Sequence, residues 1–134
     1  MTLEDLLAAA AARIRRYTPE EARAAAAHGA AIVDIRSADA RERDGAVPGA
    51  HHVPRTVLEW RVASREWTNP DLTDRRLILI CDHGYSSILA AAGLVELGVD
   101  AGDVVGGFEA WRTAGLPTRR ASHFDGMPGM APPD

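Results

Sequence analysis

The sequence predicts an α/β domain with a central, mainly parallel sheet and helices on both faces. Short apolar runs alternate with helical segments along the chain, which is the pattern of successive β-α units. The strongest run, Leu77–Ile80, has four bulky apolar residues in a row, as in a strand buried on both faces of a parallel sheet. The 134 residues match the length of one domain that can bury its own core.

The first segment, residues 1–17, is predicted to be an extra N-terminal helix outside the main domain. Thr2 is a capping residue, and Glu4 and Asp5 occupy the first turn, where the helix dipole favours acids. These acids stand where a secretory leader carries basic residues, so we expect no leader here. The main domain is expected over 18–120. Frequent Pro and Gly predict an irregular tail over 121–134.

The first half of the main domain begins with a strong helix signal. Thr18 followed by Pro19 and two acids predicts a helix that ends before Gly29. The elements expected after it are a strand, a helical turn, a strand and a helical or mixed segment, over 31–35, 40–44, 51–53 and 56–67.

The second half repeats the alternation around the Leu77–Ile80 strand. An apolar helix is expected over 88–97, where Gly98 is a C-terminal signal. Val104 and Val105 predict a last short strand, and a helix over 108–114 is expected to end at Gly115. We find no internal repeat and no linker between two domains.

Composition excludes several classes of function. Acidic residues outnumber basic ones by 19 to 15, for a net charge of −4, so we expect no nucleic-acid partner and no anionic membrane surface. All basic residues are arginine, which excludes lysine chemistry. A single cysteine, Cys81, excludes an internal disulfide and a Cys-rich zinc site. His51 and His52 are adjacent on a predicted strand and point to opposite faces, so they cannot chelate one metal together.

Cys81 follows the Leu77–Ile80 strand directly and precedes a helix. Ligand and catalytic sites of open α/β sheets lie at this position. Free N–H groups of the loop and of the helix start would stabilise a thiolate and lower its pKa. Gly84 permits a tight loop, and Ser86 and Ser87 can cap the helix or donate hydrogen bonds to an anion. The strand–Cys–loop–helix pattern alone fits a buried inert thiol equally well.

Four ordered segments decide between these two interpretations. Val33–Arg36 has the form D-x-R, and Gly45–Pro54 has the form G-x-V-P-G-A followed by V-P. Cys81–Ser87 is the loop itself, and Gly106–Pro117 has the form G-G-x-x-x-W-x-x-x-G-x-P. Together they resemble the signatures of the rhodanese-like sulfurtransferases, in particular the short single-domain bacterial thiosulfate sulfurtransferases. The chain departs from the usual family pattern at Ser86, where many members carry arginine, and at Ala46, where histidine is usual.

The resemblance implies a sulfurtransferase that works through a persulfide on Cys81. A small anionic donor such as thiosulfate would supply a sulfane sulfur, and cyanide, a thiol or an unidentified protein would accept it. No metal and no cofactor are implied, and a cytoplasmic location is expected. The residues assigned to substrate binding are the loop and three arginines of nearby strand ends: Asp82, His83, Gly84, Tyr85, Ser86, Ser87, Arg36, Arg55 and Arg61.

Individual roles are expected for several of these side chains. A carboxylate beside a thiolate raises its pKa, so we expect Asp82 to turn toward solvent. His83 could donate a hydrogen bond near the sulfur or lie on the surface. Arg36 is expected mainly to tie Asp34 or the loop in place. Arg55 or Arg61 could replace the missing loop arginine.

Two other classes of protein remain as alternatives. Cysteine phosphatases and arsenate reductases need Cys-x5-Arg, but Ser87 stands six positions after Cys81. A non-catalytic rhodanese-like module that binds or regulates a partner is the second alternative. Inactive members usually lose the cysteine, and this chain keeps it.

Overall fold

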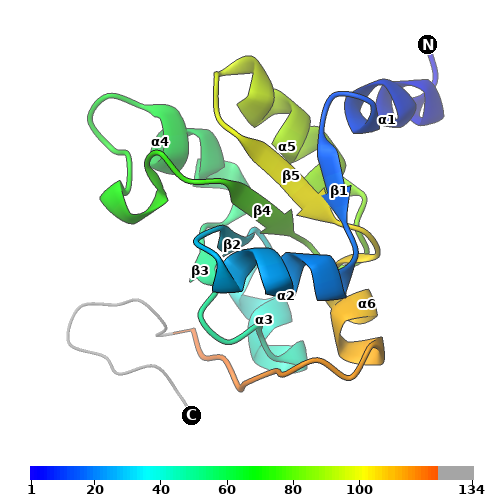
Figure 1. Cartoon of the computed structure of the whole chain (residues 1–134), viewed down its shortest axis with the longest axis vertical. Helices are drawn as coiled ribbons and strands as arrows, with labels where there is room; N and C mark the ends of the chain where they lie inside the picture. Colours follow the sequence, from blue (N-terminus) through cyan, green and yellow to red (C-terminus); the bar gives the residue numbers. More distant parts are fainter. Residues whose placement is uncertain (124–134) are drawn as a thin grey trace.

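The computed structural model describes residues 1–123, and its five strands form one parallel sheet in the order β1-β5-β4-β2-β3 (Figure 1). The strands are β1 (Arg15–Tyr17), β2 (Ala31–Asp34), β3 (His51–His52), β4 (Leu77–Ile80) and β5 (Ala101–Val104). The α-helices are α1 (Leu3–Ala11), α2 (Pro19–Ala27), α3 (Ala38–Asp44), α4 (Leu58–Ala63), α5 (Ser86–Glu96) and α6 (Gly107–Thr113). Two short 3-10 turns cover Arg55–Val57 and Pro70–Leu72. The predicted α/β class is confirmed.

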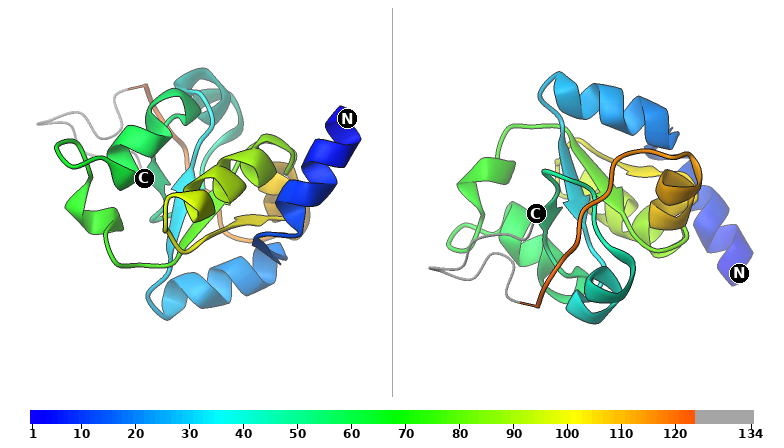
Figure 2. Two further views of the ribbon diagram at one scale, coloured as in Figure 1. Left: turned by 90° about the horizontal axis from the view of Figure 1, so that it is seen from above. Right: turned by 90° about the horizontal axis from the view of Figure 1, so that it is seen from below.

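Strand β4 lies at the centre of the sheet, and its side chains alternate between two apolar layers. Leu77 and Leu79 pack in a cluster with residues of α4 and α5. Ile78 and Ile80 pack in a second cluster with residues of α2 and α6. All four side chains are fully buried, as the continuous apolar run predicts. Figure 2 shows α2 and α5 on opposite sides of the sheet.

The N-terminal segment differs from the predicted helix over 1–17. Helix α1 ends at Ala11 and packs through Ala10 against α5, whereas Arg15–Tyr17 is strand β1 at the edge of the sheet. Strand β1 pairs with β5, where an added Cβ on Gly102 would lie 2.3 Å from the Arg15 carbonyl oxygen. This strand depends on a partner far along the chain, so local helix signals did not reveal it.

Two further differences from expectation concern α5 and β5. Helix α5 begins at Ser86, two residues before the predicted start. Strand β5 covers Ala101–Val104, whereas the expected strand was Val104 and Val105. The earlier start was missed because Gly102 and Asp103 lie within the strand and neither residue type favours one. In the predicted tail, residues 121–123 have no helix or strand, and residues 124–134 lie outside the described part of the chain.

No helix within residues 1–123 combines the length and the apolar character that crossing a bilayer requires.

Candidate active site

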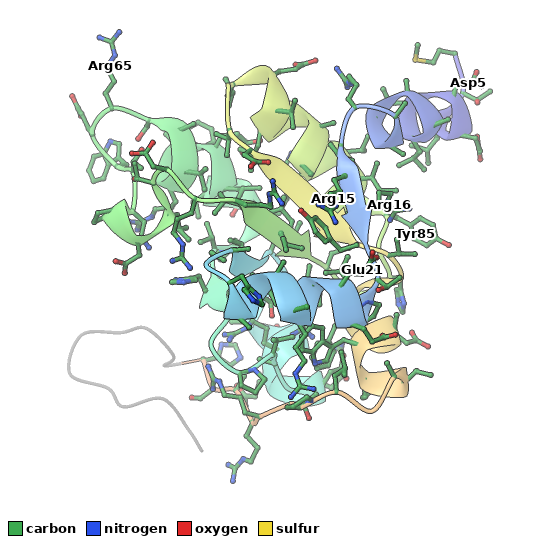
Figure 3. The ribbon with its side chains drawn as sticks, viewed as in Figure 1. Asp5, Arg15, Arg16, Glu21, Arg65 and Tyr85 are labelled. Carbon is green, nitrogen blue, oxygen red and sulfur yellow. The ribbon has the colours of Figure 1, made fainter. Side chains whose placement is uncertain are left out.

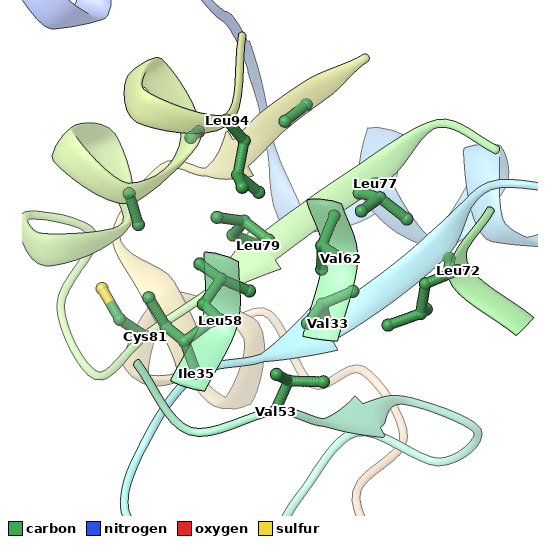
Figure 4. Close-up of a cluster of buried hydrophobic side chains, with 14 residues drawn as sticks. Val33, Ile35, Val53, Leu58, Val62, Leu72, Leu77, Leu79, Cys81 and Leu94 are labelled. Atoms are coloured by element: carbon green, nitrogen blue, oxygen red, sulfur yellow. The ribbon is translucent and has the colours of Figure 1, made fainter. Parts of the chain in front are cut away.

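Cys81 lies at the carboxyl end of the central strand, immediately after β4. Its side chain continues the alternation of Leu77 and Leu79, so the β-carbon joins the α4–α5 core cluster. Figure 4 shows the sulfur at the end of this cluster, beyond Ile35 and Leu58. The residue is 5% exposed. The strand thereby holds the thiol in a fixed place at the edge of the sheet where sites of this fold class occur.

The loop after Cys81 turns its backbone toward the sulfur. The Gly84 amide donates a hydrogen bond to Cys81 Sγ at 3.2 Å. The carbonyl oxygens of Cys81 and Asp82 accept hydrogen bonds from the amides of Phe108 and Glu109 in α6, at 2.7 and 3.1 Å. Because α6 satisfies these carbonyl groups, the loop can direct N–H groups at the sulfur.

Two glycines allow this close approach of loop and helix. Gly84 has φ +82°, and a Cβ there would lie 2.5 Å from the Gly106 nitrogen. Gly107 has φ +63°, and a Cβ there would lie 2.4 Å from the Cys81 carbonyl oxygen. Both positions require the left-handed backbone and the absence of a side chain. The second glycine of the G-G signature, Gly107, therefore has a structural reason at the Cys81 loop.

The two loop serines do not cap α5. The N-cap residue is Tyr85, which makes no side-chain capping hydrogen bond, and Ser86 and Ser87 lie in the first turn of the helix. The capping role considered for them is therefore wrong. Ser87 is fully buried, and its Oγ lies 3.3 Å from Cys81 Sγ, which donates to it.

The surroundings of Cys81 lower the pKa of its thiol. Burial of the sulfur acts to raise the pKa, since it removes the charged form from water. Hydrogen bonds at the Ser87 and Ser86 side chains and at the amides of Ser87 and Gly84 act in the opposite direction and together outweigh burial. The Ser87 hydroxyl acts in this way only when its proton points at the sulfur. This direction agrees with the one expected from the loop N–H groups.

Asp82 and His83 turn away from the sulfur toward charged neighbours. The Asp82 side chain is 44% exposed, with Oδ1 3.9 Å from Arg36 Nη1. The His83 side chain is 65% exposed, and its Nδ1 lies 2.9 Å from Glu109 Oε2 of α6. Asp82 thus lies partly in solvent, as expected, and His83 occupies the surface position considered for it.

Arg36 is a buried tie between three segments of the chain. Its Nε and Nη2 donate to both oxygens of Asp34 at 3.0 and 2.8 Å, and Nη2 also donates to the Gly45 carbonyl oxygen. The guanidinium stacks 4.1 Å from the centroid of the Phe108 ring. Its side chain is 1% exposed. These contacts fit the structural tie and leave little guanidinium surface for a substrate.

Arg55 and Arg61 occupy different places. The Arg55 amide donates to the Ile35 carbonyl oxygen just beyond β2, and its guanidinium pairs with Glu59 at 2.9 Å. Arg55 therefore lies at the carboxyl edge of the sheet, the edge at which Cys81 lies. Arg61 lines a cleft of about 600 Å³ together with His51, His52 and other residues, and Cys81 is not among those lining residues.

Two functional candidates were missed in the sequence. The Asp103 carboxylate of β5 is fully buried and accepts a hydrogen bond from Ser87 Oγ at 2.7 Å. Arg16 of β1 binds both Asp103 oxygens and donates to the Gly84 carbonyl oxygen at 2.9 Å. Figure 3 shows Arg16 beside Tyr85 of the loop. A charged residue directly before the apolar Val104–Val105 pair was the signal that could have revealed Asp103.

The described part of the chain shows no metal site. Among residues 1–123, no three His, Cys, Asp or Glu side chains gather closely enough to hold a metal ion.

Comparison with known proteins agrees with this geometry. A family model described as "Rhodanese-like domain" matches residues 18–114. The chain is 37% identical over 100 residues to the thiosulfate sulfurtransferase GlpE of Pseudomonas syringae, covering 74% of this chain and 88% of that protein. The GlpE protein of Pseudomonas entomophila is 38% identical over 100 residues, covering 74% of this chain and 85% of the relative.

A solved structure from Rhodopseudomonas palustris has a TM-score of 0.81 and 31% identity, covering 88% of this chain and 94% of that one. It is described as a protein of unknown function and possible tyrosine phosphatase. The match to the domain model and the similarity to GlpE proteins show that this chain belongs to the rhodanese-like domain family.

Proposed function

We propose that this chain is a thiosulfate sulfurtransferase with Cys81 as its nucleophile. The observation that carries the proposal is the Cys81 sulfur at the end of the central strand, with the Gly84 amide 3.2 Å from it. A lowered thiol pKa provides thiolate for nucleophilic attack. The name of the GlpE relatives supports thiosulfate as the donor.

The reaction has two displacement steps. In the first, the Cys81 thiolate attacks the outer sulfur of thiosulfate, an S–S bond forms, and sulfite leaves with the electron pair of the bond that breaks. In the second, cyanide or a thiolate attacks the terminal sulfur of the persulfide, and the Cys81 thiolate leaves. No net oxidation occurs and no cofactor takes part. The loop amides stabilise the anion in both states, as an oxyanion hole does.

The remaining loop residues form the walls of the anion site. The backbone from Asp82 to Ser87 supplies the N–H groups, and Gly84 allows the loop to close. Arg55 attracts the dianionic donor from the same edge of the sheet, in place of the arginine that many family members carry at the position of Ser86. We place the reaction in the cytoplasm, where a lone reactive thiol stays reduced.

Sulfur uptake tests the proposal directly. Purified protein treated with thiosulfate should gain the mass of one sulfur atom, and cyanide should remove it with release of thiocyanate. The Cys81→Ser variant should show neither step. Failure of the wild-type protein to take up sulfur from thiosulfate, polysulfide or any other sulfane donor would contradict the proposal and favour a non-catalytic binding module.

A cysteine phosphatase has no comparable support in this structure. The arginine of Cys-x5-Arg would stand at Ser87, which is fully buried against Asp103. Hydrolysis of an aryl phosphate at a rate above that of Cys81→Ser would reverse this conclusion.

A further inference from the structure

A hydrogen-bonded chain of side chains connects the Cys81 sulfur to a buried carboxylate. Cys81 Sγ lies 3.3 Å from Ser87 Oγ, and Ser87 Oγ lies 2.7 Å from Asp103 Oδ2. Ser87 and Asp103 are both fully buried. The Ser87 hydroxyl must therefore find its hydrogen-bond partners among these protein groups.

The single hydroxyl proton of Ser87 has two candidate acceptors, the Asp103 carboxylate and the Cys81 sulfur. A serine hydroxyl has a single proton to donate and lone pairs that accept. The contact with Asp103 is the shorter one, and an ionised acceptor makes the stronger hydrogen bond. The proton therefore points at Asp103, and an oxygen lone pair faces Cys81. In this orientation the Ser87 hydroxyl accepts a hydrogen bond from the thiol and donates none to the thiolate. Lowering of the thiol pKa is then left to the Ser86 hydroxyl and to the amides of Ser87 and Gly84.

Arg16 holds Asp103 in the accepting state. Its Nε lies 2.9 Å from Oδ1 and its Nη2 lies 3.1 Å from Oδ2, a two-pronged pairing suited to an ionised carboxylate. An ionised carboxylate accepts hydrogen bonds and cannot donate them. Toward Ser87, Asp103 can only accept.

We propose that Asp103 is a positioning residue for the Cys81 nucleophile, because its carboxylate accepts the only proton of the Ser87 hydroxyl and withholds that proton from the sulfur. The inference deepens the proposed function, since Cys81 has opposite duties in the two steps. A thiolate of higher pKa is the stronger nucleophile when sulfur is loaded, and one of lower pKa is the better leaving group when sulfur is released. By withholding the Ser87 proton, Asp103 keeps the Cys81 thiolate more nucleophilic, which favours the step that loads sulfur.

Other charged groups surround the same loop and are left unchanged in the test below. Asp82 of the loop faces Arg36, which follows β2, at 3.9 Å, and His83 faces Glu109 of α6 at 2.9 Å. Strand β4 brings only apolar side chains to the sulfur, and α5 brings Ser86 and Ser87 beside apolar residues.

The Asp103→Asn variant tests the inference through the pH dependence of Cys81 alkylation by iodoacetamide. The amide can donate to Ser87 Oγ, which turns the hydroxyl proton toward the sulfur. The alkylation midpoint should fall by about one pH unit, the equivalent of one hydrogen bond. Asp100→Asn is the matched control, because Asp100 is 65% exposed and pairs with Arg76 at 3.2 Å, and its midpoint should equal that of the wild type.

Two double variants separate proton direction from charge. Arg16→Gln with Asp103→Asn leaves the summed charge of the pair unchanged and avoids an unpaired arginine, so it serves if the single variant does not fold. It should show the same fall in midpoint. In a Ser87→Ala background, Asp103→Asn should shift the midpoint by less than half as much as in the wild type.

Three results would overturn the inference. The first is an unchanged or raised alkylation midpoint in folded Asp103→Asn. The second is an unchanged or raised midpoint in the double variant Arg16→Gln with Asp103→Asn. The third is a fall in midpoint on Asp103→Asn that is equally large in the wild-type and the Ser87→Ala backgrounds. Alkylation requires no sulfur transfer, so this test can fail while sulfur uptake succeeds, and the reverse also holds.

Discussion

Arg16 Nη2 donates a hydrogen bond of 2.9 Å to the Gly84 carbonyl oxygen, which ties the edge strand β1 to the loop around Cys81. The same guanidinium binds both oxygens of the buried Asp103. The loop is thus held on one side by α6 and on the other by Arg16, which comes from the N-terminal part of the chain. Strand β1 is therefore part of the support of the site.

We expect Arg16→Gln to destabilise the protein by about 3 kcal/mol in urea unfolding, because the variant leaves the Asp103 carboxylate buried without its cation. Arg13→Gln is the control, since Arg13 forms an exposed pair with Glu96. That pair should contribute less than about 1 kcal/mol. Equal losses in the two variants would show that burial of Asp103 does not matter.

Gly84→Ala should lower sulfur uptake from thiosulfate at least about tenfold, because its Cβ would meet the Gly106 nitrogen and push the loop away from the sulfur. Gly98→Ala is a close control. Gly98 has φ +83° with no atom near the added Cβ, so it carries the backbone strain without the clash. That strain costs about 1–2 kcal/mol of stability, and uptake should stay at the wild-type level. Normal uptake by Gly84→Ala would contradict the role of the loop geometry.

The alkylation midpoint of Cys81 should lie at lower pH in the folded protein than in the same protein unfolded in urea, because the loop lowers the thiol pKa. The rate of alkylation also depends on how deeply the thiol is buried, so the comparison uses the pH midpoints of alkylation and not the rates. A folded pKa below the unfolded one contributes stability that is present above the unfolded pKa and lost as the pH falls through the folded pKa. A folded midpoint equal to or above the unfolded one would remove the support for an anion-binding loop.

Arg55→Gln should raise the KM for thiosulfate about threefold or more and leave kcat unchanged, because a charge at the edge of the site attracts the donor without touching the reacting atoms. The rise should shrink at high salt. Arg61→Gln should have a smaller effect, since Arg61 lines the separate cleft. Arg65, which Figure 3 places far from Arg16 and Tyr85, provides the charge-matched control Arg65→Gln. The same rise in all three variants would mean that only net charge matters.

Local patterns predicted most elements well, and long-range contacts account for the errors. The capping signal at Thr18-Pro19 and the apolar run Leu77–Ile80 lead to α2 and β4 with the expected bounds. Strand β1 was missed because its hydrogen bonds go to β5, more than eighty residues away. The early start of α5 was missed because two serines resemble a capping pair, whereas here Ser87 bonds to a buried carboxylate.

By itself, the sequence determined the order of β-α units, the place of Cys81 at the end of a buried strand, and the glycine, Gly84, that allows a tight loop. These follow from periodicity and backbone preference, which act over a few residues. Only the tertiary structure decided that Arg36 also contacts the Gly45 carbonyl oxygen and the Phe108 ring. It alone decided that Arg61 lines another cleft, and that Asp103, paired with Arg16, accepts a hydrogen bond from Ser87. Those outcomes depend on which strands pair at the sheet edges and on the desolvation of charges between them, and neither can be read from neighbouring residues.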